Sequence, residues 1–313
     1  MTFALQIVCV FGLIACGFFA RKRRMVSAQG TGELAHLATD LIYPALIFVS
    51  IIQLSADDLI ANALLPLLVM VIALVGFGLG LIAVRFLGCV PPQTARAFLF
   101  HCLMNNYLFL PLPLVLFLYG ERGVALLVYS SVGYEIILWT LGVFLFTGKD
   151  ASLGMRIRQM MSPPFIVLFG SLALVLVRDT FAIELRGIAA PLAESLIFVA
   201  QMLGQGTVAI SVIVAGSRFA VLEMRTIRGW RIWLVSAIRL VIVPLILLPL
   251  LFWLPLDPMT RGILSIVAVM PSAMVSVIFS ERYGGDSEFI AGGLLLTNLW
   301  AVITVPTFLA IVL

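Results

Sequence analysis

Charged side chains are scarce in this chain, because only 11% of its 313 residues are Asp, Glu, Lys or Arg. Water-soluble domains contain about 25%, so the scarcity argues against a soluble enzyme. Hydrophobic residues make up 63% of the chain, and the mean hydropathy is +1.19. A helix that crosses the hydrocarbon core needs about 20 mostly apolar residues. The composition therefore predicts an integral membrane protein with little left for a soluble domain.

Cysteine and histidine are also few, at four and two residues. The cysteines have no Cys-x-x-Cys spacing and the histidines lie far apart in the sequence, which disfavours disulfide frameworks, zinc sites and haem attachment. The chain has no His-Glu-x-x-His motif either. We expect no metal, no cofactor and no catalytic group. The net charge of +4 is assigned to loop orientation instead of to a nucleic-acid partner.

Long apolar runs dominate what remains, and their charged or Pro/Gly interruptions divide them into ten predicted membrane-spanning helices. These cover residues 2–20, 34–54, 63–84, 95–118, 122–146, 163–178, 190–216, 231–253, 261–280 and 288–312. The first run is followed, and not preceded, by basic residues, so we expect it to stay as a membrane helix and not to be removed as a signal peptide.

Basic residues concentrate in every second connector between these predicted helices. The connectors after the odd-numbered helices hold 14 of the 19 Lys and Arg residues, the other connectors hold four, and Arg239 lies within a predicted helix. Loops rich in Lys and Arg face the cytoplasm. The pattern predicts a multi-pass protein of the inner (plasma) membrane with both termini outside.

The chain also shows signs of an internal repeat. The turn Tyr119-Gly120-Glu121-Arg122 recurs 164 positions later as Tyr283-Gly284-Gly285-Asp286. Five helices per half force the second half into the opposite orientation, which predicts inverted repeats over residues 1–150 and 151–313. Inverted repeats with interrupted helices at matching positions are typical of secondary transporters, whose substrate site lies near the bilayer midplane.

The fourth predicted helix contains Asn105, Asn106, Pro111 and Pro113 in its middle. Each proline removes an amide donor and clashes with the carbonyl four residues earlier, and in lipid the freed carbonyls need polar partners. Two interpretations remain open here. The asparagines either hold a kinked helix against its neighbours or form a substrate site in a broken helix.

The ninth predicted helix carries Pro271 and Ser272 at the matching position. A single kinked helix would be a weak signal, and the pairing with the fourth helix strengthens it. Two half-helices that cross at the midplane present positive N-terminal ends to an anion.

Arg239 lies deep inside the eighth predicted helix. Arginine at the centre of a membrane helix costs about 2.5–3.5 kcal/mol on insertion scales, so a partner is expected. Three hypotheses remain: the side chain extends to the cytoplasmic interface, offsets the negative C-terminal ends of half-helices, or holds an anionic substrate.

Further polar residues lie in the fifth, seventh and tenth predicted helices. Gln201 and Gln205 fall on one helical stripe, and Glu135 aligns within one residue of Asn298 between the two halves. Two interpretations of Glu135 remain. It has a structural role, as a partner of Arg239 or as a protonated buried acid, or it is a coupling group for protons or cations.

The sequence resembles the auxin efflux carrier family, which includes plant PIN-type auxin exporters and bacterial carriers assigned to malate, malonate or related acids. Asn106, Phe109 and Pro113 match its Asn-x-Gly-Phe-x-x-x-Pro signature, with Leu108 in place of the glycine. The pattern also matches in three later segments: Arg239 to Pro244, Met270-Pro271-Ser272-Ala273 with Glu281-Arg282-Tyr283-Gly284, and Ile303-Thr304-Val305-Pro306.

The resemblance implies two inverted five-helix repeats with crossed, broken helices 4 and 9, a fold similar to those of bile-acid sodium symporters and sodium/proton antiporters. Helices 1, 2, 6 and 7 would form a scaffold, and helices 3–5 and 8–10 a transport domain. A carrier that exports small organic carboxylates, auxin-like or dicarboxylate, by elevator-type alternating access would follow. A homodimer through the scaffold helices is a further expectation. The alternatives are a sodium- or proton-coupled symporter and, with less support, a membrane receptor or channel.

Overall fold

The computed structural model describes residues 3–88, 90–107, 110–147, 160–182, 189–220, 227, 229–283 and 285–312. Phe109 and Gly284, which carry part of the family resemblance, lie outside these ranges, as do the basic residues Lys149, Arg156, Arg158, Arg225 and Arg228 of two predicted connectors. The described part of the chain is helical and contains no strand, only one isolated bridge between two extended segments. The all-helical membrane fold predicted from the composition is confirmed.

The first half contains α1 (Phe3–Lys22), α2 (Ala28–Leu37), η1 (Ala38–Ile42), α3 (Tyr43–Ile52), α4 (Ala56–Ala61), α5 (Leu64–Phe86), α6 (Pro92–Leu103), α7 (Pro111–Ile137), η2 (Leu138–Gly142) and α8 (Val143–Thr147). The second half contains α10 (Pro163–Thr180), α11 (Ala189–Phe219), α12 (Trp230–Ala237), η4 (Ile238–Ile242), α13 (Val243–Trp253), α14 (Pro258–Ala268), α15 (Val275–Tyr283) and α16 (Ser287–Val312).

Seven helical stretches of the described residues are long and apolar enough to cross a membrane. They are Ala28–Ile52, Ala56–Phe86, Pro111–Thr147, Pro163–Thr180, Ala190–Phe219, Trp230–Trp253 and Ser287–Val312. The other three predicted spans correspond to α1 and to the fourth and ninth predicted helices, which the structure interrupts. The fourth and fifth predicted helices also meet without a loop, since only Gly120, at φ 63° and ψ −160°, departs from helical geometry between them. The count of ten spans therefore stays a prediction.

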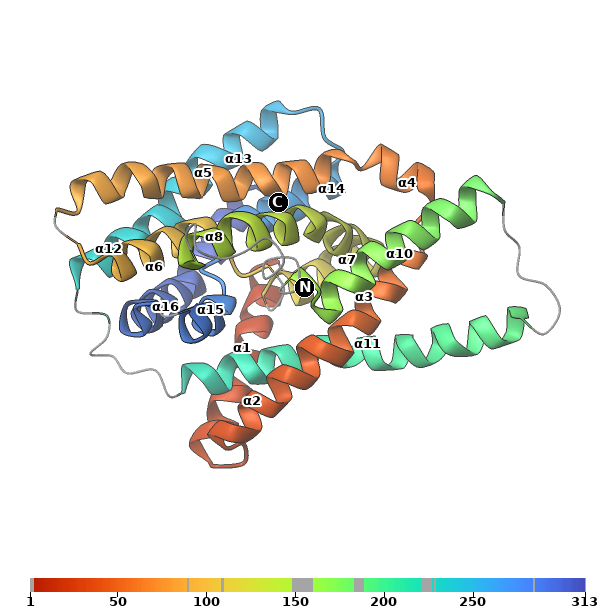
Figure 1. The fold of residues 1–313 in the computed structure, drawn as a ribbon, viewed down its shortest axis with the longest axis horizontal. Coiled ribbons are helices and arrows are strands. Elements are labelled where there is room, and N and C mark those ends of the chain that lie inside the picture. Colours follow the sequence, from red (N-terminus) through yellow and green to blue (C-terminus); the bar gives the residue numbers. More distant parts are fainter. Residues whose placement is uncertain are drawn as a thin grey trace.

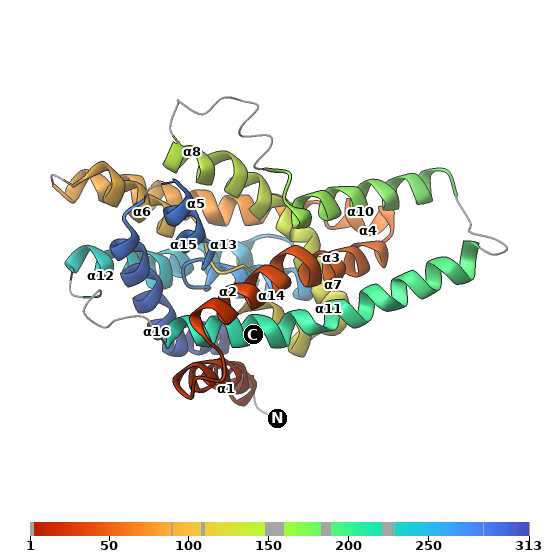
Figure 2. The same cartoon turned by 60° about the horizontal axis from the view of Figure 1, so that its bottom comes forward.

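Packing groups the helices into two sets (Figures 1 and 2). Helices α1, α2, α3, α10 and α11 pack on one another, and α10 and α11 extend on one side of the molecule. On the other side, α5 packs on α6 and α7, while α16 packs on α6, α12, α14 and α15. The main connection between the sets is the contact of α3 with α7.

Three five-residue π-helical segments interrupt the long helices, and two of them precede a proline. η1 is followed by Pro44 and η4 by Pro244. A proline ring clashes with the carbonyl four residues earlier, here that of Asp40 or Leu240. The wider π turn relieves the clash, and π segments occur frequently at functional sites. The π-helical segment η4 carries Arg239.

Candidate functional site

The fourth predicted helix is broken in the structure. α6 ends at Leu103, and Met104 is extended, with φ −105° and ψ 119°. The helix resumes as α7 with Pro111 at its first position. The N–H group that proline lacks would have no partner within the helix there. The segment between the two half-helices includes Asn105 and Asn106, as the sequence predicted.

The ninth predicted helix is broken as well. α14 ends at Ala268, α15 begins at Val275, and Pro271 lies between them. The proline ring disfavours helical geometry at the preceding residue, Met270, so the local sequence explains why the helix stops here.

The two breaks pair with each other, although they lie far apart in the sequence. The backbone N–H of Asn106 donates to the carbonyl of Pro271 at 2.7 Å, and the N–H of Ala273 donates to the carbonyl of Met104 at 3.1 Å. These bonds flank an antiparallel bridge between Asn105 and Ser272. Each extended segment thus satisfies polar backbone groups of the other, which a membrane interior requires.

The geometry of this bridge predicts a spontaneous disulfide. In a pair flanked by hydrogen bonds on both sides, the Cα atoms lie about 4.5 Å apart, within the range that a disulfide spans. A variant with Asn105→Cys and Ser272→Cys, in a background without the four native cysteines, should therefore oxidise without a linker. Peptide mapping by mass spectrometry measures the bond. Gly78→Cys with Ser272→Cys is the matched control, because Gly78 faces open space. Equal oxidation of the two pairs would contradict the pairing.

Arg239 is fully buried and points at the end of α14, not at the membrane surface. Its Nε donates to the carbonyl of Met270 at 3.0 Å and its Nη2 to the carbonyl of Ala268 at 3.3 Å. A Cβ atom on Gly76 would lie 2.2 Å from the Cys102 carbonyl oxygen and 3.4 Å from Arg239 Nη1. Only glycine lets α5 approach the end of α6 and the guanidinium this closely. Of the three hypotheses for Arg239, the contacts match compensation of a half-helix C-terminal end.

The polar side chains of both breaks are buried. Asn105 is 4% exposed, and its Nδ2 donates to the carbonyl of Val267 at 2.6 Å, so it also serves the end of α14. Asn106 is 2% exposed. The Oγ of Ser272 and the Nη1 of Arg239 have no hydrogen-bond partner within the described residues. Buried polar atoms without a partner are rare in folded proteins and call for an explanation.

Glu135 forms no ion pair with Arg239 among the described residues, while its other interpretations, a protonated buried acid or a coupling group, stay predictions. Its carboxylate accepts a hydrogen bond from Trp139 Nε1 at 2.7 Å, one helical turn further along. The described residues contain three side-chain ion pairs, and neither Glu135 nor Arg239 takes part in one. On α16, Asn298 Nδ2 donates to the Leu294 carbonyl at 2.8 Å, and its buried Oδ1 has no partner within the described residues.

A cavity of about 460 Å³ lies between α3, α7 and α11. Gln201 and Gln205 line it together, so the predicted polar stripe faces this cavity. Leu112, which lies between Pro111 and Pro113, lines the cavity from α7. Pro111 and Pro113 are buried at the same end of α7. The cavity thus begins where the broken helix resumes.

Two groups of residues not predicted for the site also belong to it, one beside the first break and one lining the cavity. Tyr107 donates from its hydroxyl to the carbonyl of Leu127 at 3.0 Å, contacts Ser130, and its ring centroid lies 4.9 Å from that of Tyr134. Gln53 and Glu121 line the cavity. Tyr107 adjoins Asn106 in the sequence, so its position was a usable signal, whereas Gln53 and Glu121 are brought together only by tertiary packing.

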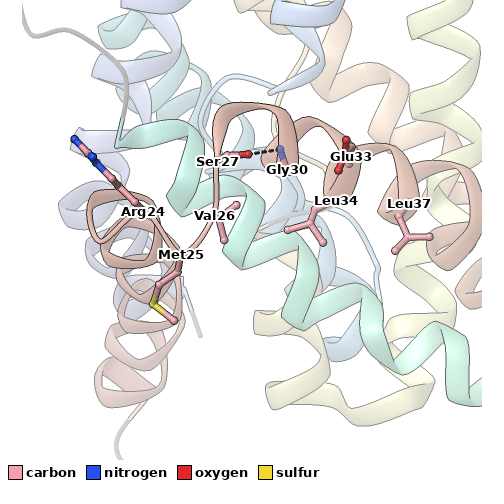
Figure 3. Close-up of a pocket in the computed structure, with 8 residues that line it drawn as sticks. All are labelled: Arg24, Met25, Val26, Ser27, Gly30, Glu33, Leu34 and Leu37. Atoms are coloured by element: carbon pink, nitrogen blue, oxygen red, sulfur yellow. Dashed lines mark hydrogen bonds between the residues drawn. The ribbon is translucent and has the colours of Figure 1, made fainter.

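A larger groove, of about 520 Å³, lies at the turn between α1 and α2 and is lined by Arg24, Met25 and Glu33 among others. Figure 3 shows Arg24 and Met25 after the end of α1, and the bond from the Gly30 N–H to Ser27 Oγ that begins α2. None of the residues predicted for a site lines this groove. The smaller cavity beside the helix breaks is therefore the candidate site.

The family follows from a comparison with known proteins. A family model described as "Membrane transport protein" matches residues 2–309, nearly the whole chain. This chain belongs to that auxin efflux carrier-like family of membrane transport proteins. The transporter is similar to "Uncharacterized transporter MJ1031" of Methanocaldococcus jannaschii, with 21% identity over 304 residues, which are 96% of this chain and 95% of that protein. The resemblance noted in the sequence is confirmed, and the protein is a membrane transporter and not an enzyme.

Proposed function

We propose that this transporter exports small organic carboxylate anions by elevator-type alternating access. The observation that carries the proposal is the pairing of two interrupted helices through their breaks. Half-helices that meet inside a membrane bring four helix ends to one place, and each end has a partial charge of roughly half an elementary charge. Such a meeting point binds charged substrates in transporters.

The charges at this meeting point favour an anion. The negative C-terminal end of α14 is already compensated, because Arg239 and Asn105 donate to its last carbonyls. The N-terminal ends of α7 and α15, which begin at Pro111 and Val275, carry partial positive charge. A carboxylate placed between the breaks would meet these ends without competing for Arg239.

Asn105 or Asn106 would donate hydrogen bonds to that carboxylate, with Ser272 Oγ beside them. The apolar body would occupy the cavity of about 460 Å³ between α3, α7 and α11. Ligand cavities of roughly 300–1,000 Å³ with a few polar groups are usual for small molecules. Pro111, Pro113 and Pro271 would hold the breaks open, and Gln201 and Gln205 would support the substrate from the scaffold side.

In this proposal, α1, α2, α3, α10 and α11 form the scaffold, and the helices around the breaks form the moving domain. The grouping of helix contacts supports this division. The scaffold helices would also form a homodimer interface within the lipid bilayer. The inverted repeats of residues 1–150 and 151–313 would supply the two access states, with both termini outside.

A coupled symporter is the second candidate. The buried Oδ1 of Asn298, which has no partner within the described residues, and the carboxylate of Glu135 are oxygen atoms near the transport helices that a cation or proton would use. An exporter driven by substrate charge alone needs neither group. A receptor or channel would not require paired breaks.

Substrate counter-flow in proteoliposomes tests the proposal. Vesicles loaded with an unlabelled organic carboxylate should accumulate the labelled acid, with and without sodium or proton gradients. Organic cations of similar size should not exchange. Absence of exchange for every carboxylate tried, with folded protein in the vesicles, would overturn the proposed function, and exchange only with sodium present would establish the symporter.

A further inference from the structure

The cavity beside the helix breaks contains a negative charge and no positive one. Glu121 is the carboxylate among its twelve lining residues, which include no Lys or Arg. Its other polar lining groups are neutral, namely the carboxamides of Gln53, Gln201 and Gln205 and the hydroxyl of Ser50. For a transporter of anions, this lining is unexpected.

Two basic residues near the cavity, Arg122 beside Glu121 in the sequence and Arg178 beside Gln53 in space, do not pair with Glu121. Arg122 binds both carboxylate oxygens of Asp58, at 2.5 and 3.2 Å. Arg178 bonds Asp179 at 2.6 Å and also donates to the carbonyls of Ile52 and Leu54, at 2.8 Å each, on either side of Gln53. Both guanidinium groups therefore have other partners, and the exposed side chain of Glu121 forms no ion pair with either of them.

Glu121 lies at the end of the cavity opposite the breaks. Leu112 and Glu121 both line the cavity from α7. Leu112 is separated from Tyr119 by seven helical residues, roughly 10 Å, and Glu121 follows the kink at Gly120. A substrate whose carboxylate lies at the breaks would extend along this path. Its far end would approach the carboxylate of Glu121 and the carboxamides around it.

We propose that Glu121 makes this transporter selective for monocarboxylates, whose far end is neutral or donates hydrogen bonds, over dicarboxylates. This inference rests on the proposed function. A second carboxylate on the substrate would face Glu121 without a counter-ion, and like charges a few ångströms apart repel. Glutamine and serine side chains instead pair well with hydroxyl, amide or ring N–H groups.

Three substrates of nearly equal size test the selectivity: phenylacetate, 4-carbamoylphenylacetate and 4-carboxyphenylacetate. Initial rates of uptake into proteoliposomes, measured by mass spectrometry at neutral pH, give the ratio of kcat/KM. For the native protein we expect the two monoanions to exceed the dianion by roughly tenfold. The carbamoyl compound controls for size, since it differs from the dianion chiefly in charge.

Glu121→Gln should reduce this preference to about threefold or less, and Glu121→Lys should reverse it. High salt should weaken the native preference, because the Debye length falls from about 10 Å at 0.1 M to about 3 Å at 1 M. Glu33→Gln, in the groove between α1 and α2, is the matched control and should leave the preference unchanged.

The outcomes separate the two proposals. If none of the three acids is transported by folded protein, the exporter proposal fails for this class of substrates. If the acids are transported but the dianion is as good as its carbamoyl analogue, or if Glu121→Gln and Glu121→Lys keep the native ratio, the inference about Glu121 is wrong and the exporter proposal stands.

Discussion

Arg239→Leu is expected to lower transport at least tenfold while the protein still reaches the membrane. The guanidinium donates to the carbonyls of Ala268 and Met270 in a fully buried position. Leucine leaves both carbonyls without these donors, and each buried polar group left unpaired costs about 1–3 kcal/mol. The end of α14 would move to find other partners, and the pairing with the first break would shift with it. Transport rate per folded molecule, with folded protein quantified by size-exclusion chromatography, measures the effect.

Arg231→Gln provides the control for Arg239→Leu. Arg231 belongs to the same stretch of helix, but its hydrogen bond from Nη2 to the Leu87 carbonyl is long, at 3.4 Å. Its loss should change transport less than about twofold. Arg239→Lys, which retains a charge but not the two-pronged geometry, should fall between the two. Unchanged kinetics for Arg239→Leu would show that the contacts with α14 are dispensable.

A crosslink between α3 and α7 is expected to stop transport almost completely. Tyr43 of α3 lies close to Ser131 of α7 across the proposed boundary between scaffold and moving domain. In the cysteine-free background, Tyr43→Cys with Ser131→Cys, joined by a short bifunctional thiol reagent, would hold the two parts in one position. Elevator-type access needs them to slide past each other, so exchange measured before and after reaction should fall to background.

The matching control lies within the scaffold. Thr31 of α2 and Ser217 of α11 are both buried, and their hydroxyl oxygens are 2.6 Å apart. Crosslinking Thr31→Cys to Ser217→Cys joins two helices that move together in the proposal, so transport should continue. Full transport after the Tyr43–Ser131 crosslink, with the reaction verified by mass spectrometry, would rule out sliding at this boundary.

The broken helices were predictable because their causes are local. Pro111, Pro113 and Pro271 each remove an amide donor and disfavour helical geometry at the preceding residue, and Asn105 and Asn106 are too polar for an undisturbed membrane helix. Proline alone is not sufficient, since Pro249 and Pro306 lie within helices. The hydrophobic runs likewise fixed the all-helical membrane class. These are properties of ten to twenty consecutive residues, which sequence alone contains.

Tertiary partners were not predictable in the same way. The pairing of Asn105 with Ser272 joins segments that are far apart in the chain, and its register depends on how the helices pack. One of the interpretations left open for Glu135 paired it with distant Arg239, whereas the structure gives its carboxylate a hydrogen bond from Trp139, one helical turn away. The cavity was missed because Gln53, Glu121 and Gln205 come from three helices that only the folded chain brings together.

In the proposed function, the paired breaks bind an organic carboxylate that leaves the cell without an obligatory coupling ion. An inside-negative potential supplies about 2.3 kcal/mol per charge per 100 mV, equivalent to a gradient of roughly 40- to 50-fold, since 1.4 kcal/mol is about tenfold. A monoanion could therefore be exported on this energy alone. Its movement would carry charge that can be recorded directly.

Currents on solid-supported membranes test this claim most directly. We expect carboxylate-dependent currents that persist without sodium, change little with a proton gradient, and fall at least tenfold in Asn106→Ala. Asn62→Ala, in the turn before α5, should leave them unchanged. Strict dependence on sodium, or native currents in Asn106→Ala, would contradict the account.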